Sequence, residues 1–293
     1  MTTLGIGTWQ WGDREVWGYG RSYGEADVRA AFSAAVEAGV TLFDTAEIYG
    51  GGESERLLGR CVRASPQAVQ VATKFFPFPW RLFQRGSLLS ALQASLRRLG
   101  LERVNLYQIH WPLPLVRGDI WADELAEAVR AGLAEHVGVS NYNKANLRRM
   151  HQALAKRGIA LTSNQIEYSL LQRKHERDGL IRACAELNVT VIAYSPLAMG
   201  LLSGKYLPDH PPSGVRRWRA GSKLARAARL MPVVREIGAA HGGRTPAQVA
   251  LSWLMAHGAV PIPGAKSAEQ ARENAGAREL QLTPDELERL DRL

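Results

Sequence analysis

Short apolar runs alternate with helical patterns along most of this chain, and this alternation constrains the fold more than any other feature. The runs are rich in β-branched residues and nearly continuous in apolar character, which is typical of parallel strands covered on both faces. The predicted strands span 40–44, 69–74, 106–110, 137–140, 161–165, 190–194, 260–262 and 279–281. Eight strand–helix units in 293 residues predict an α/β protein with a single domain over residues 1–293, a (β/α)8 TIM barrel.

The segment before residue 40 is expected to precede the barrel. It reads as a short N-terminal hairpin, LGIGTWQWG, followed by a helix over 25–38. The rival fold is a doubly wound open sheet, which usually opens with a strand and a G-x-G-x-x-G phosphate loop. No such motif begins a βαβ unit in this chain, so the barrel is favoured.

Charge and composition limit the partners that we expect. The net charge is +9, from 37 basic and 28 acidic residues, and the basic residues are spread along helix faces with their densest cluster at 214–230. No nucleic-acid motif accompanies this charge, so most of it is interpreted as solvated surface. No apolar run reaches the ~18 residues of a membrane span, and no secretory leader is visible. We therefore expect a cytoplasmic monomer that binds neither nucleic acid nor membrane.

Four polar residues lie at or just after the ends of predicted strands. Asp44 closes VTLFD, Lys74 closes VQVATK, His110 closes NLYQIH, and Tyr49 follows the first of these runs in TAEIYGGGE. In a barrel, the carboxyl ends of all strands meet at one mouth, where active sites lie. A phenol, an amine, a carboxylate and an imidazole gathered there can protonate a carbonyl oxygen while a cofactor supplies hydride. Taken singly, each residue also has an ordinary structural explanation, such as a rim ion pair or a core histidine.

The chain resembles the aldo-keto reductases over nearly its whole length. The segments that carry this resemblance are LGIGTWQWG, FDTAEIYGGGESERLLG, VATK, LYQIHWP, GVSNYN, NQIEYSLL, AYSPLAMGLLSGKY, TPAQVALSWLM and IPGAKSAEQARENAGA. The resemblance implies a (β/α)8 barrel that binds a nicotinamide dinucleotide without a Rossmann domain. It also implies reversible reduction of a small carbonyl compound to an alcohol.

The resemblance assigns roles to the four strand-end residues. Tyr49 matches the family's proton donor, Lys74 and Asp44 match the pair that tunes it, and His110 matches the residue that orients the carbonyl. A phenol with an ordinary pKa of about 10 is a poor acid near neutrality, and a nearby ammonium lowers that pKa.

The cofactor residues follow from the same resemblance. Ser140, Asn141 and Gln165 match positions that bind the nicotinamide amide, and Tyr194 matches the aromatic that stacks on its ring. Positions along the pyrophosphate correspond to Ser195, Leu197, Gly200 and Lys205. Positions at the adenosine end correspond to Gly264, Lys266, Ser267, Gln270, Glu273 and Asn274.

The choice between NADP(H) and NAD(H) depends on the adenosine end. Lys266 and Ser267 suit a 2′-phosphate, which favours NADP(H). Many NADP-preferring relatives carry an arginine where Gln270 stands, and an amide cannot make the bidentate contact of a guanidinium with phosphate. We therefore expect NADP(H) to be preferred moderately, with NAD(H) still usable.

Aromatic residues are the candidate walls of a substrate pocket. Trp9 and Trp111 match wall positions in the family, while Trp11, Phe78, Trp80 and Trp218 are candidates by their location in loops. An aromatic pocket suits aldehydes. Only one helix follows the last predicted strand, so we expect an open site with broad substrate selection.

Two other functions remain open from the sequence. A cofactor-binding sensor or regulatory subunit with vestigial reductase activity would share the fold and the cofactor site. A barrel with lyase or hydrolase chemistry is disfavoured because no metal-ligand or nucleophile motif is present. An NADPH-dependent aldehyde or ketone reductase is the leading hypothesis.

Overall fold

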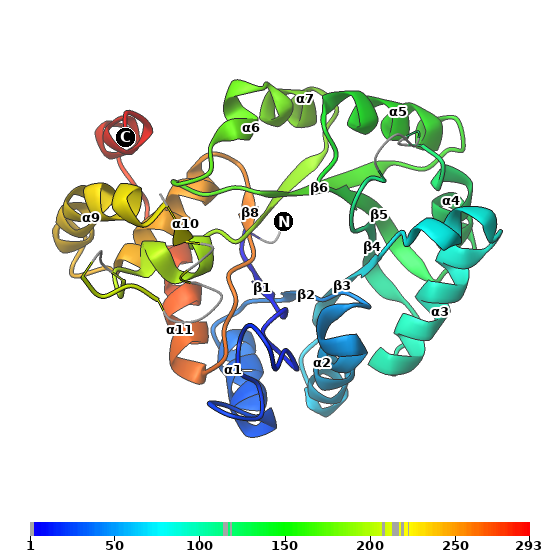
Figure 1. Cartoon of the computed structure of the whole chain (residues 1–293), viewed down its shortest axis with the longest axis horizontal. Helices are drawn as coiled ribbons and strands as arrows, with labels where there is room; N and C mark the ends of the chain where they lie inside the picture. Colours follow the sequence, from blue (N-terminus) through cyan, green and yellow to red (C-terminus); the bar gives the residue numbers. More distant parts are fainter. Residues whose placement is uncertain are drawn as a thin grey trace.

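The computed structural model describes residues 3–113, 117, 119–206, 209–212, 217, 220–221 and 223–293. Eight parallel strands follow one another in chain order around a barrel (Figure 1). They are β1 (Gly5–Gly7), β2 (Leu42–Asp44), β3 (Gln70–Phe75), β4 (Val104–Ile109), β5 (Ala134–Ser140), β6 (Leu161–Glu167), β7 (Thr190–Tyr194) and β8 (Val260–Pro261). The predicted (β/α)8 barrel is confirmed.

Helices cover the outside of this barrel (Figure 1). The α-helices are α1 (Glu25–Glu37), α2 (Glu53–Ala64), α3 (Ser87–Leu99), α4 (Ala122–Arg130), α5 (Lys144–Ala155), α6 (Lys174–Arg177), α7 (Leu180–Glu186), α9 (Lys223–Ala240), α10 (Pro246–Ala256), α11 (Ala268–Gly276) and α12 (Pro284–Asp291). Short 3₁₀ turns are η1 (Tyr49–Gly52), η2 (Pro79–Phe83), η3 (Ala198–Ser203) and η4 (Ala277–Glu279). No helix in the described ranges is long and apolar enough to cross a membrane.

The barrel closes through its first strand, which corrects the predicted N-terminal hairpin. Gly5–Gly7 pairs in parallel with β2, and the Gly7 N–H donates to the Pro263 carbonyl oxygen at 3.0 Å. A Cβ on Gly7 would lie 2.9 Å from the Ile262 carbonyl oxygen, so the glycine permits this approach. With Ile6 as the one β-branched residue between two glycines, the segment gives only a weak strand signal in the sequence.

The eighth predicted strand, 279–281, is also wrong. The 3₁₀ turn η4 ends at Glu279, and Leu280 follows as its C-terminal cap in extended conformation without pairing in the sheet. Leu280 is buried, and its carbonyl oxygen accepts from the Ser252 hydroxyl at 2.7 Å. The apolar character of this segment therefore reflects packing against α10 instead of a sheet position.

Capping residues set the starts of two helices. Thr245 and Thr283 each form a capping box, with Gln248 and Glu286 three residues further on. A Ser or Thr followed three residues later by Gln or Glu is the usual sequence pattern of such a cap. Helix α2 begins differently, at Glu53 after Gly52, and the Ser54 side chain points inward and donates to the Thr8 carbonyl oxygen at 2.9 Å.

The interior of the barrel changes from apolar to polar toward its mouth. A small apolar cluster fills the lower part, formed by Leu42, Ala72, Leu106, Ile192 and Ile262. Further along the same strands the buried side chains are polar. Because successive residues of a strand point to opposite faces, Leu106, Gln108 and His110 share the inward face along β4 and just beyond it. The fold thus delivers polar groups to the carboxyl ends of the strands.

Candidate active site

The Lys74 ammonium lies at the centre of the predicted catalytic residues. Its side chain is fully buried, and Nζ forms an ion pair with the Asp44 carboxylate. The same nitrogen donates to the Thr45 carbonyl oxygen at 2.8 Å and to the Tyr49 hydroxyl oxygen at 3.4 Å. Asp44, Tyr49 and Lys74 are therefore brought together as one connected group.

A run of three glycines places Tyr49 at this position. Gly50, Gly51 and Gly52 have φ values of +56°, +64° and +87°, a left-handed backbone that residues with side chains rarely adopt. A Cβ on Gly50 would also lie 2.8 Å from the Gly12 carbonyl oxygen. The sequence YGGG thus forms the tight turn η1, which holds the phenol above the end of β2.

His110 completes the group from the neighbouring strand. It follows β4 directly, and its backbone N–H donates to the Phe75 carbonyl oxygen at 2.8 Å. Its ring meets the Tyr49 ring edge-on, with centroids 5.6 Å apart. Within the described part of the chain, its buried Nδ1 has no hydrogen-bond partner.

Burial controls the protonation of these groups. Burial, and then the Lys74 charge, lowers the pKa of His110 to about 2, so the imidazole is neutral at physiological pH. Burial opposes the charge on Lys74, but Asp44 and Tyr49 outweigh it and raise the lysine pKa. For Tyr49, burial raises the pKa and outweighs the opposing pull of Lys74. Lys74 therefore lowers the phenol pKa, as expected, but burial sets the net direction.

The second oxygen of Asp44 is held by two amides. Gln165 Nε2 donates to Asp44 Oδ2 at 2.9 Å, and Gln108 Nε2 donates to the same oxygen at 3.3 Å. Gln108 is fully buried and was missed in the sequence, although its position two residues before His110 puts both on one face of the strand. A carboxylate with this set of donors is fixed in orientation as well as in charge.

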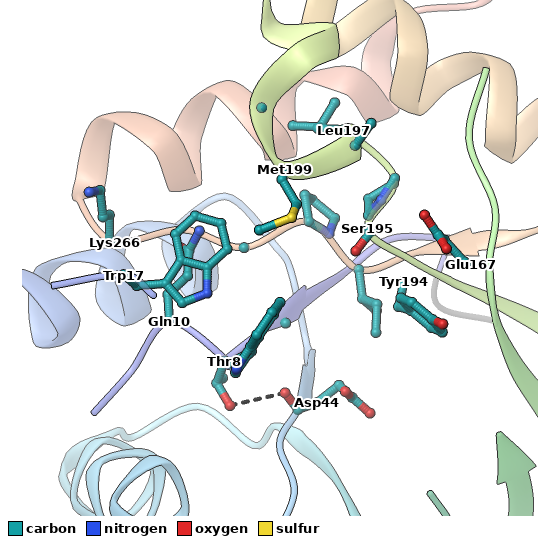
Figure 2. Close-up of a pocket in the computed structure, with 18 of the residues that line it drawn as sticks. Thr8, Gln10, Trp17, Asp44, Glu167, Tyr194, Ser195, Leu197, Met199 and Lys266 are labelled. Atoms are coloured by element: carbon teal, nitrogen blue, oxygen red, sulfur yellow. Dashed lines mark hydrogen bonds between the residues drawn. The ribbon is translucent and has the colours of Figure 1, made fainter. Parts of the chain in front are cut away.

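A cavity of about 820 Å³ opens from this group across the mouth of the barrel (Figure 2). Most predicted site residues line it: Trp9, Asp44, Tyr49, His110, Trp111, Ser140, Asn141, Gln165, Tyr194, Ser195, Leu197, Gly200, Lys205, Gly264, Lys266, Gln270, Glu273 and Asn274. Lys74 lies beneath its floor, in contact with Asp44 and Tyr49.

At the end of the cavity near β5 and β7, polar side chains are fixed by one another. Tyr194 donates its hydroxyl to Asn141 Oδ1 at 2.9 Å, and Asn141 Nδ2 donates to the His110 carbonyl oxygen at 3.2 Å. Ser140 donates to the Gln165 carbonyl oxygen at 2.9 Å. These bonds connect the predicted nicotinamide-binding residues to His110.

At the other end, the cavity meets the start of α11. Ser267 caps this helix by accepting from the Gln270 N–H at 3.3 Å, and Gln270 Oε1 accepts from the Lys266 N–H at 3.0 Å. Ser267 itself does not line the cavity. A helix start with an adjacent lysine is a favourable place for a phosphate.

Gln10 and Gly264 both line the cavity and pack closely against each other. A Cβ on Gly264 would lie 2.8 Å from the Gln10 side chain, so this contact requires glycine. Gln10 Oε1 is buried with no hydrogen-bond partner among the described residues, which leaves an acceptor available to a ligand. These features agree with the shape and chemistry of a dinucleotide.

Several residues that line the cavity were not predicted as site residues from the sequence. They include Thr8, Gln10, Trp17, Glu167 and Met199, all labelled in Figure 2, and Lys223 from the start of α9. Lys223 pairs with Glu167 at 2.9 Å. The Asp13 carboxylate accepts from the backbone N–H of Trp17 at 3.1 Å and so supports the turn that carries the Trp17 ring. Thr8, Gln10 and Trp17 lie in irregular backbone, which carries no periodic signal. Glu167, the last residue of β6, could have been found because it shares a strand face with Gln165.

Three predicted pocket walls do not line the cavity. Trp11 is fully buried, and its Nε1 donates to the Ala265 carbonyl oxygen at 2.8 Å, so it is a core residue. Phe78 and Trp80 stack on each other with centroids 4.5 Å apart, but neither lines the cavity. Trp218, and most of the basic segment up to residue 222, lie outside the described residues.

Comparison with known proteins identifies the family. The model of the Aldo/keto reductase family matches residues 3–293. A chloroplastic pyridoxal reductase of Arabidopsis thaliana is 39% identical over 300 residues, covering 98% of this chain and 81% of that protein. An uncharacterized oxidoreductase of Mycobacterium tuberculosis is 42% identical over 290 residues, covering 97% and 86%.

Solved structures agree with these sequence matches. An aldo-keto reductase of Klebsiella pneumoniae in complex with NADPH is 28% identical, with a TM-score of 0.76 and coverage of 99% and 90%. A glycerol dehydrogenase of Gluconobacter oxydans is 25% identical, with a TM-score of 0.85 and the same coverage. The chain therefore belongs to the aldo/keto reductase family of oxidoreductases.

Proposed function

We propose that this enzyme reduces aldehydes or ketones to alcohols with NADPH, in a reversible reaction at the Tyr49 end of the cavity. The observation that carries the proposal is the contact of the buried Lys74 ammonium with the Tyr49 hydroxyl, beside a neutral His110. This arrangement provides a proton donor and a hydrogen-bond donor for one carbonyl oxygen.

The proton step uses residues of this chain. Tyr49 donates its hydroxyl proton to the substrate oxygen as negative charge develops there, and Lys74 stabilises the phenolate that remains. The neutral His110 ring donates a hydrogen bond to the same oxygen and orients the carbonyl. Asp44 keeps Lys74 charged and in place through its ion pair. The reduced nicotinamide, when bound, supplies the hydride that reaches the carbonyl carbon.

The rest of the cavity is proposed to bind this cofactor. Ser140, Asn141 and Gln165 would hold the nicotinamide amide, and Tyr194 would lie against its ring. Lys266 and the start of α11 would bind the adenosine phosphate, with Gln270 limiting the preference for NADP(H) over NAD(H). The Klebsiella pneumoniae relative in complex with NADPH supports this choice of cofactor.

The substrate is a small carbonyl compound in this proposal. The names of two relatives, a pyridoxal reductase and a glycerol dehydrogenase, refer to different compounds. Trp9, Trp17 and Trp111 give the cavity aromatic walls, which favour carbonyl compounds with a flat apolar group.

The decisive experiment follows NADPH oxidation by absorbance with a panel of aldehydes and ketones. We expect turnover by the wild-type enzyme and loss of that turnover in Tyr49→Phe, with NADPH binding measured by fluorescence retained in both. Turnover no greater than that of Tyr49→Phe for every substrate would contradict the proposal. Tight NADPH binding combined with that result would favour a cofactor-binding sensor.

A further inference from the structure

Two stacked aromatic rings lie beside the catalytic centre but outside its cavity. Trp80 is 57% exposed, although tryptophan usually buries most of its surface. Phe78 lies parallel to it, with an interplanar angle of 9°. Phe78 is partly buried, and neither ring belongs to the core, so the exposed Trp80 ring needs an explanation.

The pair is continuous with the catalytic histidine. The His110 ring meets Phe76 edge-on at 5.6 Å, Phe76 meets Phe78 at 4.7 Å, and Phe78 meets Trp80 at 4.5 Å. We call Phe76, Phe78 and Trp80 the aromatic shelf. It leads from the residue that is proposed to orient the carbonyl to the open surface beyond the mouth of the barrel.

The shelf is held rigidly by Arg81. The guanidinium forms a partly buried ion pair with Glu47 at 2.6 Å and also donates to the Phe76 carbonyl oxygen at 2.8 Å. Glu47 in turn accepts from the Phe76 N–H at 2.6 Å, and the Arg81 guanidinium carbon lies 5.3 Å from the centroid of the Phe78 ring. A surface that is ordered before binding loses little conformational entropy when a ligand arrives.

The cavity also opens toward apolar surface near the catalytic residues. Trp111 directly follows His110, lines the cavity and is 46% exposed, and Ile48 directly precedes Tyr49 and is likewise exposed. A substrate whose carbonyl carbon lies at Tyr49 and His110 therefore has apolar surface on its way out. A second ring on such a substrate would find aromatic faces instead of water.

We propose that the aromatic shelf binds the distal ring of biaryl carbonyl substrates, in which a second aromatic ring extends away from the reacting aldehyde. This inference depends on the proposed carbonyl reduction and names its substrate class. Offset or edge-on contact with Phe78 and Trp80 stabilises the bound substrate and its transition state equally. The gain therefore appears in KM more than in kcat.

The test compares benzaldehyde with its meta-phenyl and para-phenyl derivatives, using NADPH at saturation. We expect kcat/KM for the better biaryl aldehyde to exceed that for benzaldehyde by about tenfold, the effect of one to two aromatic contacts. Trp80→Ala is expected to lower this ratio about threefold to tenfold, through a rise in KM for the biaryl aldehyde. Trp80 is largely exposed, so this substitution leaves the core intact.

Phe83→Ala is the matched control. Phe83 belongs to the same turn, η2, and is 89% exposed, but it forms no aromatic ring pair with Phe78 or Trp80 among the described residues. We expect it to keep the wild-type ratio. A ratio near one in the wild type, or an equal ratio in wild type and Trp80→Ala, would overturn the shelf while leaving carbonyl reduction established. An absence of turnover with benzaldehyde as well would instead overturn the proposed function.

A different occupant would give a different result. If the stacked rings covered a second copy of this chain, Trp80→Ala would change the sedimentation of the enzyme and leave the substrate ratio unchanged. That combination would also overturn the shelf. A fall in the ratio with unchanged sedimentation supports it.

Discussion

The Lys74 ammonium nitrogen lies 3.4 Å from the Tyr49 hydroxyl oxygen and 4.9 Å from the centroid of its ring. The lysine therefore approaches the phenol from the side of its oxygen, where charge appears when the proton leaves. It is also paired with Asp44, so its charge does not depend on solvent. This contact is the basis of the first prediction.

Lys74→Met is expected to lower kcat about 10²–10⁴-fold, because the phenolate loses its stabilising charge. It should also reduce the free energy of unfolding by about 3–5 kcal/mol, because the buried Asp44 carboxylate loses its partner. Adding Asp44→Asn to the same chain should restore much of the stability without restoring kcat. Urea unfolding and steady-state kinetics check both effects, and a Lys74→Met enzyme with normal kcat would refute this role.

Gln108→Met keeps the side-chain volume but removes one donor to Asp44. Without this donor, the negative charge of Asp44 should raise the pKa of Tyr49 further. Because kcat falls when Tyr49 loses its proton, the alkaline fall in kcat should move to higher pH. We expect kcat itself to decrease by about threefold to tenfold, the effect of one weak hydrogen bond to a charged group. The measurement is kcat against pH, together with the Kd of NADPH, which should not change because Gln108 does not line the cavity.

Ser163→Ala serves as the control for Gln108→Met. Its hydroxyl approaches Gln108 Oε1 at 3.5 Å and lies at a similar depth, but makes no bond to Asp44. We expect the alkaline fall in kcat of Ser163→Ala to occur at the same pH as in the wild type. An equal shift in both variants would mean that packing, and not the donor to Asp44, sets the profile.

His110 should make the fold sensitive to acid. Its pKa falls from an ordinary 6.5 in the unfolded chain to about 2 in the folded protein, so the unfolded state binds more protons between these values. Its contribution to the free energy of unfolding is thus complete above about pH 6.5 and decreases as the pH falls toward 2. His110→Asn should flatten this acid dependence in urea unfolding at several pH values, whereas His136→Asn, at an exposed site, should not. A wild-type slope in His110→Asn would show that other groups are responsible.

Gln270→Arg should strengthen the preference for NADPH. A guanidinium can make two bonds to a phosphate, so the ratio of kcat/KM for NADPH to that for NADH is expected to rise about tenfold. Glu269→Gln is the matched control, since it changes the net charge equally in the same helical turn without lining the cavity. Comparable ratios in the two variants would mean that general charge, and not a contact with the phosphate, sets the preference.

The residues that end strands were predictable because a parallel barrel brings every strand end to one mouth. Asp44, Lys74 and His110 needed only the recognition of their strands, and Gln108 could have been added from the alternation of faces in β4. Trp9 and Trp11 show where this reasoning ends. They lie two residues apart in the turn after β1, yet one lines the cavity and the other is buried in the core. Irregular backbone has no period, so only the folded structure separates them.

Gly7 pairs with the segment that begins at Pro263, and this contact, the seam of the barrel, has a consequence for the synthesis of the enzyme. The first strand is synthesised long before its second neighbour, because nearly the whole barrel lies between them in the sequence. Trp9 and Gln10 stand on one side of that seam, and Gly264 and Lys266 on the other. A nascent chain therefore lacks a complete nucleotide site until the segment that begins at Pro263 has been synthesised, and cofactor capture should wait until the barrel has closed.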